Sequence, residues 1–218
     1  MPIAGTRPMI TTSPLAFARS LAAVAAASLL CGAATPGPAP GQPRYDADGR
    51  MLFPADYREW VFLSSGLNMS YAPGPAAAGA DMFDNTFVPL AAYRAFLATG
   101  VWPDKTVILL ENRGGTSQGS INKHGQFQTT AYMGAEAHVK DTARFKGGWG
   151  FFGFDTDGKP ASEIPHQAVC YACHEQHAAA DTTFVQFYPT LLPVATARGT
   201  LSQAYLAETA AAAPAPAR

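Results

Sequence analysis

The sequence predicts an α+β domain with a mainly antiparallel β-sheet, flanking helices and a further helix near the C-terminus. Apolar residues at helical spacing follow Pro54 and Pro89, and each of these runs ends at a glycine. Between residues 101 and 155 the pattern changes to β-branched and aromatic residues in alternation, which is typical of strands. The glycines and prolines in that stretch do not fit a bundle that is helical throughout.

The expected elements, in chain order, are a helix from Pro54 capped at Gly66, a strand over 85–88, a helix from Pro89 to Gly100, strands over 106–110, 127–139 and 149–154, a helix beginning at 170–174, and a last helix capped by Asp181. Alternation along 127–140 predicts two faces. One face carries Phe127, Thr129, Ala131, Met133, Ala135, Ala137 and Val139, and the other carries Tyr132, Glu136, His138 and Lys140.

Residues 170–174 read Cys-Tyr-Ala-Cys-His, which is C-x-x-C-H, the attachment sequence for a c-type haem. Two thiols one helical turn apart bond to the haem vinyl groups, and the adjacent imidazole becomes an axial iron ligand. We therefore predict one haem c bound through thioethers to Cys170 and Cys173, with His174 as the metal ligand. The predicted helix at this motif is then the haem-binding helix.

Two other interpretations of the motif stay open. The cysteines could form a disulfide or a thioredoxin-like redox pair, but such a pair follows a strand, and Pro165 breaks the approach here. Zinc could bind Cys170, Cys173 and His174, but no second cysteine pair completes a tetrahedral site.

The N-terminus has the pattern of a signal peptide over residues 1–34. Arg7 and Arg19 precede an apolar run over 21–30, and small residues follow it at 32–34. The run is shorter than the ~20 apolar residues that span a membrane. Cys31 could be a lipidation site that tethers the protein to a membrane, but Leu30 is unfavourable for that signal, so we expect simple cleavage and a periplasmic or otherwise exported protein.

Composition and charge define the remaining domain boundaries. Residues 35–50 are a Pro/Gly-rich linker, 51–207 form one haem domain, and 208–218 form an Ala/Pro-rich, disordered tail. The chain has 15 Lys and Arg against 16 Asp and Glu, and removal of the two arginines of the signal leaves a charge of about −3. Without a basic run or stripe, a nucleic-acid partner is not expected.

Several segments, in order, carry a family resemblance: residues 57–61, 89–93, 136–141, 144–145, 148–151, 170–174 and 184–189. Together they resemble the cytochrome P-460 family, which includes the related cytochrome c′-beta. The resemblance implies a five-coordinate c-haem protein with a largely antiparallel sheet, which can be a homodimer. Some members oxidise hydroxylamine, and others bind nitric oxide or related small ligands.

The resemblance also assigns two site positions. Oxidising members carry a lysine cross-linked to the haem, and the matching position here is Leu110, which has no nucleophilic nitrogen. Lys123 or Lys140 would have to approach from elsewhere. The family's distal carboxylate matches Glu136, which could accept a proton from a bound ligand or hydrogen-bond to it as a catalytic residue.

Three functions follow. We expect an exported mono-haem cytochrome that binds nitric oxide or a similar small ligand at an open distal site. The alternatives are an oxidoreductase that acts on hydroxylamine or a related nitrogen compound, and an electron-transfer cytochrome, so whether the chain is an enzyme stays open. A redox partner protein is expected in addition to the small gaseous or nitrogenous ligand. Candidate sixth ligands are His124, His138, Met69, Met82 and Met133, and candidates for contact with the haem propionates are Arg113 and Lys140.

Overall fold

The computed structural model describes residues 39–70 and 81–212. The predicted signal peptide, Cys31 and the end of the predicted tail from residue 213 lie outside the described residues. Among the described helices, none is both long enough and apolar enough to cross a membrane.

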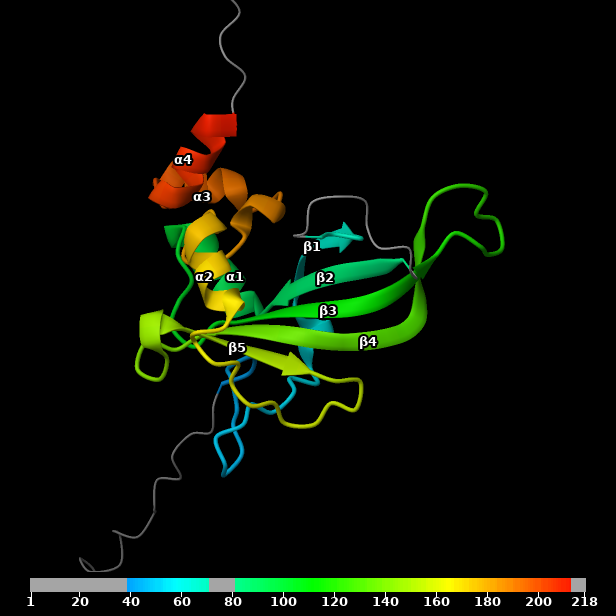
Figure 1. Ribbon diagram of the computed structural model, residues 1–218, viewed down its shortest axis with the longest axis horizontal. Coiled ribbons are helices and arrows are strands. Elements are labelled where there is room, and N and C mark those ends of the chain that lie inside the picture. Colours follow the sequence, from blue (N-terminus) through cyan, green and yellow to red (C-terminus); the bar gives the residue numbers. More distant parts are fainter. Residues whose placement is uncertain (1–38, 71–80, 213–218) are drawn as a thin grey trace, which may run out of the picture. The chain divides into compact units, whose positions relative to one another are not determined.

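Five strands form one antiparallel sheet in the order β1-β2-β3-β4-β5 (Figure 1). The strands are β1 (Val61–Leu67), β2 (Met82–Val88), β3 (Val107–Thr116), β4 (Phe127–Lys140) and β5 (Trp149–Phe154). The helices are α1 (Leu90–Thr99), α2 (Val169–His177), α3 (Leu192–Arg198) and α4 (Gln203–Ala212), with 3-10 turns η1 (Tyr57–Glu59), η2 (Lys146–Gly148) and η3 (Val185–Phe187). All four α-helices gather at one end of the sheet, which confirms the predicted α+β class.

Two apolar cores lie on either side of the sheet. One packs the sheet against the helices through large buried side chains such as Phe96, Trp102 and Leu191. The other lies under the opposite face, where Leu109, Val139 and Phe152 meet the segment around Met51. Residues 39–50 belong to this packing, because the ring of Tyr45 contacts Phe152 and the Arg144 guanidinium lies 3.8 Å from the Tyr45 ring centroid.

The helix predicted from Pro89 to Gly100 is present as α1. Gly100 has a φ of +75° and its N–H donates to the Phe96 carbonyl at 2.7 Å, which closes the helix. A Cβ at this position would also lie 2.7 Å from Thr200 Oγ1, so the connection requires glycine.

Two predicted helices are wrong. Only η1 is helical after Pro54, and residues 61–67 form β1, because Val61, Phe62 and Ser64 pair with β2 and strand pairing outweighs the weak helical pattern. Asp181 does not cap a helix: it lies in a tight turn, and the residues after it form η3 before α3 and α4. Helix α4 extends to Ala212 and so includes the first residues of the predicted tail.

The predicted faces of β4 are wrong at Tyr132, because β4 contains a bulge. Asn112 pairs with Gly134 but Arg113 pairs with Tyr132, so Met133 is an extra residue. Tyr132 therefore faces the same core as Ala135, and Met133 is 46 % exposed. Gly134 has a φ of +115°, and a Cβ there would lie 2.8 Å from the Phe154 carbonyl oxygen.

The bulge gives a direct test. Gly134→Ala should lower the free energy of unfolding by about 2 kcal/mol or more, because it adds left-handed strain and a backbone clash. Gly153→Ala on β5 is the matched control, since a Cβ there meets nothing within 4 Å. Guanidinium chloride unfolding of both variants measures the difference. Equal losses of stability would contradict this account of the bulge.

Candidate haem site

A cavity of about 350 Å³ lies between one face of the sheet and helix α2. All five strands contribute to the lining, and every second residue of a strand points to the same face of the sheet. The lining residues of β3 are Ile108, Leu110 and Asn112. Helix α2 contributes Cys170, Cys173 and His174, so the whole C-x-x-C-H ligand set opens onto this one cavity.

His174 is fixed by packing and by one hydrogen bond. Its ring is 7 % exposed and lies against the rings of Phe184, His138 and Phe151, with centroid distances of 4.2, 4.4 and 4.9 Å. Its Nδ1 lies 2.9 Å from the Thr182 carbonyl oxygen, which leaves Nε2 for a metal. Burial lowers the pKa of His174, and the Thr182 hydrogen bond opposes this only in part, so the imidazole is the neutral form that ligands require.

The Thr182 carbonyl is presented by a strained turn between Ala180 and Thr183. Asp181 and Thr182 have φ values of +49° and +58°, which are unfavourable for a β-branched residue such as Thr182. Asp181 is held by Lys140 Nζ at 2.7 Å and by the Trp102 backbone N–H at 2.9 Å. Lys140 Nζ also donates to the Trp102 carbonyl at 2.8 Å. These contacts hold the turn, and therefore the imidazole, in place.

The cysteines of the motif fit thioether attachment. Both are partly buried free thiols on α2, not bonded to one another. Among the described residues no three His, Cys, Asp or Glu side chains come together as a protein-only metal site. Two thiols, a neutral imidazole with a free Nε2 and an adjoining cavity are the groups that a covalently attached haem needs.

Two carboxylates face the cavity from the sheet. Glu136 on β4 pairs across the strands with Leu110, and Asp84 on β2 pairs with Asn112. The Glu136 carboxylate is accessible from the open cavity but otherwise surrounded by protein, and this burial raises its pKa. Burial, and then the charge of Glu136, raise the pKa of Asp84 to about 6.

Some of the other predicted site residues line the cavity and some do not. Leu110, Met69, Met82 and His138 line the cavity. Side chains that are not part of its lining are Lys123, His124, Met133, Arg113 and Lys140. His138 lies beside His174 at 4.4 Å between centroids, whereas two imidazoles on opposite sides of one iron have centroids about 6 Å apart. The contact of Arg113 and Lys140 with the haem propionates stays a prediction; in the structure Arg113 pairs with Glu111 and Lys140 pairs with Asp181.

A model of the family described as Cytochrome P460 matches residues 54–185. The chain belongs to the cytochrome P460 family. The match includes η1, the whole sheet, α2 and the turn that holds His174. Membership in this family implies a haem-binding protein, in agreement with the ligand set on α2. No curated protein matches the chain.

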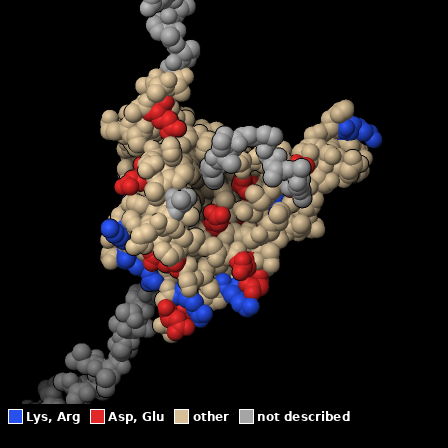
Figure 2. Space-filling view, in the orientation of Figure 1, with Lys and Arg blue, Asp and Glu red and all other residues tan. Residues whose placement is uncertain are grey.

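In this family member, the charged side chains of the cavity lining are acidic, although other Asp and Glu side chains lie outside the cavity. Figure 2 shows Asp and Glu atoms inside the hollow, and most Lys and Arg atoms of this view along its lower edge and on the β3–β4 hairpin. Among the described residues that line the cavity, the charged side chains other than histidine are Asp84 and Glu136, and none is Lys or Arg.

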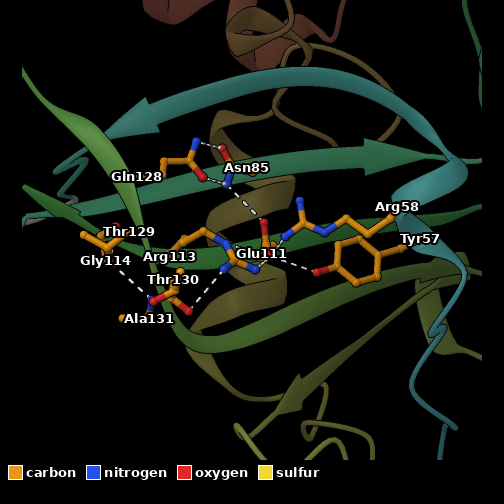
Figure 3. Close-up of polar contacts among 10 residues, drawn as sticks. All are labelled: Tyr57, Arg58, Asn85, Glu111, Arg113, Gly114, Gln128, Thr129, Thr130 and Ala131. Atoms are coloured by element: carbon orange, nitrogen blue, oxygen red, sulfur yellow. Dashed lines mark hydrogen bonds and ion pairs between the residues drawn. The ribbon is translucent and has the colours of Figure 1, made fainter. Parts of the chain in front are cut away.

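Arg113 is held on the opposite face of the sheet by Glu111, a fully buried carboxylate of β3 (Figure 3). Glu111 accepts hydrogen bonds from Tyr57 Oη at 2.8 Å, Arg113 Nε at 3.1 Å and Asn85 Nδ2 at 3.1 Å, and it pairs with Arg58. Burial alone would raise the pKa of Glu111, but these hydrogen bonds and the Arg58 charge lower it. The carboxylate is therefore ionised and fully paired.

Sequence reasoning missed Asp84, Asn112 and the Asp181–Thr182 turn. Extending the strand predicted over 85–88 back to Met82 places Asp84 on the face of Thr86, so the alternation could have found it. The Thr182 contact is made by a backbone carbonyl, and a backbone group has no residue type that marks it in a sequence.

The raised pKa of Asp84 predicts a pH-dependent gain for Asp84→Asn. An increase from 3.8 to about 6 means that ionised Asp84 costs up to about 3 kcal/mol above pH 6, and nothing below pH 4. The variant should be more stable than the parent by 1 to 3 kcal/mol (roughly) at pH 8, and the gain should shrink as the pH falls to 4. Guanidinium chloride unfolding across this range measures it.

Asp157→Asn is the control for this measurement, because the hydrogen bond from Lys159 lowers the pKa of Asp157. That variant should show no gain at any pH. A gain for Asp84→Asn that does not depend on pH would contradict the assignment.

The turn predicts coupling between Lys140 and Asp181. Lys140→Met should cost about 2–4 kcal/mol, because it leaves the mostly buried Asp181 carboxylate without its cation. Asp181→Asn in the same chain should restore part of that loss, so the two changes together cost less than their sum. Urea unfolding of the double-mutant cycle measures the coupling. Lys159→Met is the control, because its side chain is 81 % exposed, and it should cost under about 0.5 kcal/mol. If the losses of Lys140→Met and Asp181→Asn simply add in the double variant, the two residues do not stabilise the turn together.

Proposed function

We propose that this protein carries one haem c, attached through Cys170 and Cys173 and ligated by His174, and that it binds nitric oxide or a similar small ligand. The observation that supports this most is that the complete C-x-x-C-H set opens onto a cavity of about 350 Å³. A haem held there would supply an iron with one axial position free for a small molecule. Haem c attachment takes place outside the cytoplasm, and the signal-peptide pattern over 1–34 supports export.

Leu110 gives weight to ligand binding over oxidation. Its side chain lines the cavity at the position where oxidising members of the family carry the cross-linking lysine. Neither Lys123 nor Lys140 is part of the cavity lining, and the Lys140 amine is bound to Asp181 and Trp102. We therefore expect attachment through thioethers alone.

Hydroxylamine oxidation is the second candidate, and Glu136 is the observation that favours it. Its carboxylate faces the cavity with a raised pKa, which suits a group that accepts a proton from a bound nitrogen compound. Electron transfer would need a second strong axial ligand. The thioethers of Met69 and Met82, which line the cavity, are the side chains to test for that role.

Spectroscopy and turnover of the full chain, produced with c-type maturation machinery, separate these functions. We expect thioether-bound haem, a high-spin ferric spectrum, rapid uptake of nitric oxide and no sustained hydroxylamine turnover. Turnover that falls at least tenfold in Glu136→Gln, but not in the exposed-site control Glu59→Gln, would favour the enzyme. A low-spin spectrum that becomes high-spin in Met69→Leu or Met82→Leu would favour the electron carrier.

A further inference from the structure

The cavity has an unusual charge balance for a site that takes an anionic cofactor. Apart from the haem-attachment residues, the titratable side chains of its described lining are Asp84, Glu136, His138 and Tyr188. The described lining of the cavity therefore carries two carboxylates and no Lys or Arg, so the charge of these groups is negative.

The basic side chains of the sheet and of η1 form ion pairs outside the cavity lining. Arg58 and Arg113 pair with Glu111 on the opposite face, and Lys140 pairs with Asp181 at 2.7 Å. Moving Lys140 toward the cavity would leave the mostly buried Asp181 carboxylate without its cation, which costs several kcal/mol (about 3–5). Moving Arg58 or Arg113 would remove one of the two cations that neutralise the buried Glu111. The negative charge of the cavity is therefore a fixed property of the fold.

The sheet side of the cavity also offers unpaired hydrogen-bond acceptors. Asp84 and Glu136 accept no hydrogen bond from the described residues, and Asn112 Oδ1 is buried without a partner. Asn112 lies directly across from Asp84 in the strand register, so these two acceptors are neighbours on one face. Buried acceptors of this kind are satisfied by a donor, either an ordered water or a ligand with N–H or O–H groups.

We propose that this cavity selects its ligand by charge, so that it takes neutral or protonated small nitrogen compounds and rejects small anions, with Asp84 as a specificity-determining residue beside Glu136. The inference rests on the proposed haem site and deepens it. Its physical basis is that like charges repel strongly in a partly desolvated cavity, where the effective dielectric constant is far below that of water. An entering anion meets two carboxylates and no Lys or Arg side chain, whereas a neutral molecule is not repelled by these charges.

The test compares an anion with a neutral ligand on the haem-loaded full chain at pH 8, where Asp84, with its pKa of about 6, is ionised. Azide and nitric oxide are titrated against the ferric protein and followed by absorbance. Asp84→Asn and Glu136→Gln should each tighten azide binding by about 5- to 30-fold and raise the ratio of azide to nitric oxide affinity by at least about fivefold. Glu59→Gln removes one exposed carboxylate outside the cavity and should change neither affinity.

The reduction potential of the haem is a second readout that needs no ligand. A carboxylate in the cavity that would hold the haem would stabilise the ferric state, so Asp84→Asn should raise the midpoint potential and Glu59→Gln should leave it unchanged. Absence of nitric oxide uptake in the parent protein would contradict the proposed function. In that case the midpoint potentials of the parent and of Asp84→Asn would still test whether the Asp84 charge acts on the haem. Equal changes in azide and nitric oxide affinity, or a potential that Asp84→Asn does not move, would overturn the proposal.

Discussion

Glu111 and the groups that neutralise it fix the central strand of the sheet. A fully buried carboxylate is tolerated only where it is paired, and here the partners come from η1, β2 and β3 itself. Because side chains alternate along a strand, the orientation of Glu111 toward one face sends its neighbours Leu110 and Asn112 to the other. A slip of β3 by one residue would bury Leu110 among the arginines and place the Glu111 charge in the cavity. The ion pairs and hydrogen bonds of Glu111 therefore fix the register of β3 from the face opposite the cavity, and this register places Leu110 and Asn112 in the cavity lining.

The opposite wall of the cavity is secured in a different way. Helix α2 carries the C-x-x-C-H residues of the proposed haem site, and the orientation of His174 depends on the carbonyl of Thr182, which lies in an unfavourable backbone conformation. Such a turn persists only where the surroundings determine it, and Lys140 at the end of β4 does so through Asp181. Strand β4 therefore contacts the helix side of the cavity through Lys140 and forms part of the sheet side through Glu136. Sheet and helix are linked through one strand, which keeps the imidazole and the carboxylates at a fixed separation.

Elements with a strong local pattern could be predicted from the sequence. Strand β5 and helix α1 have clear patterns and glycine or proline boundaries, and the C-x-x-C-H residues predicted as the haem site lie on one cavity. The errors arose where tertiary structure overrides a local pattern. Residues 61–67 pair with β2 although they follow a helix-start signal, and the bulge at Met133 moves Tyr132 to the other face without any change in alternation. The contact between Thr182 and His174 depends on a backbone atom, so no residue type could have indicated it.

Glu111 and Asp84 lie on neighbouring strands of one sheet but differ in their hydrogen bonds and in the direction of their pKa shifts. Glu111 is surrounded by donors, its pKa is lowered, and the packing around it explains its presence. Asp84 accepts no hydrogen bond from the described residues, its pKa is raised to about 6, and its charge reduces the stability of the folded chain. Asparagine would fit the same space without that cost. A charge that the fold does not need, facing the cavity at the haem-attachment motif, is best explained by what enters the cavity, since unfavourable electrostatics of this kind concentrate at functional sites.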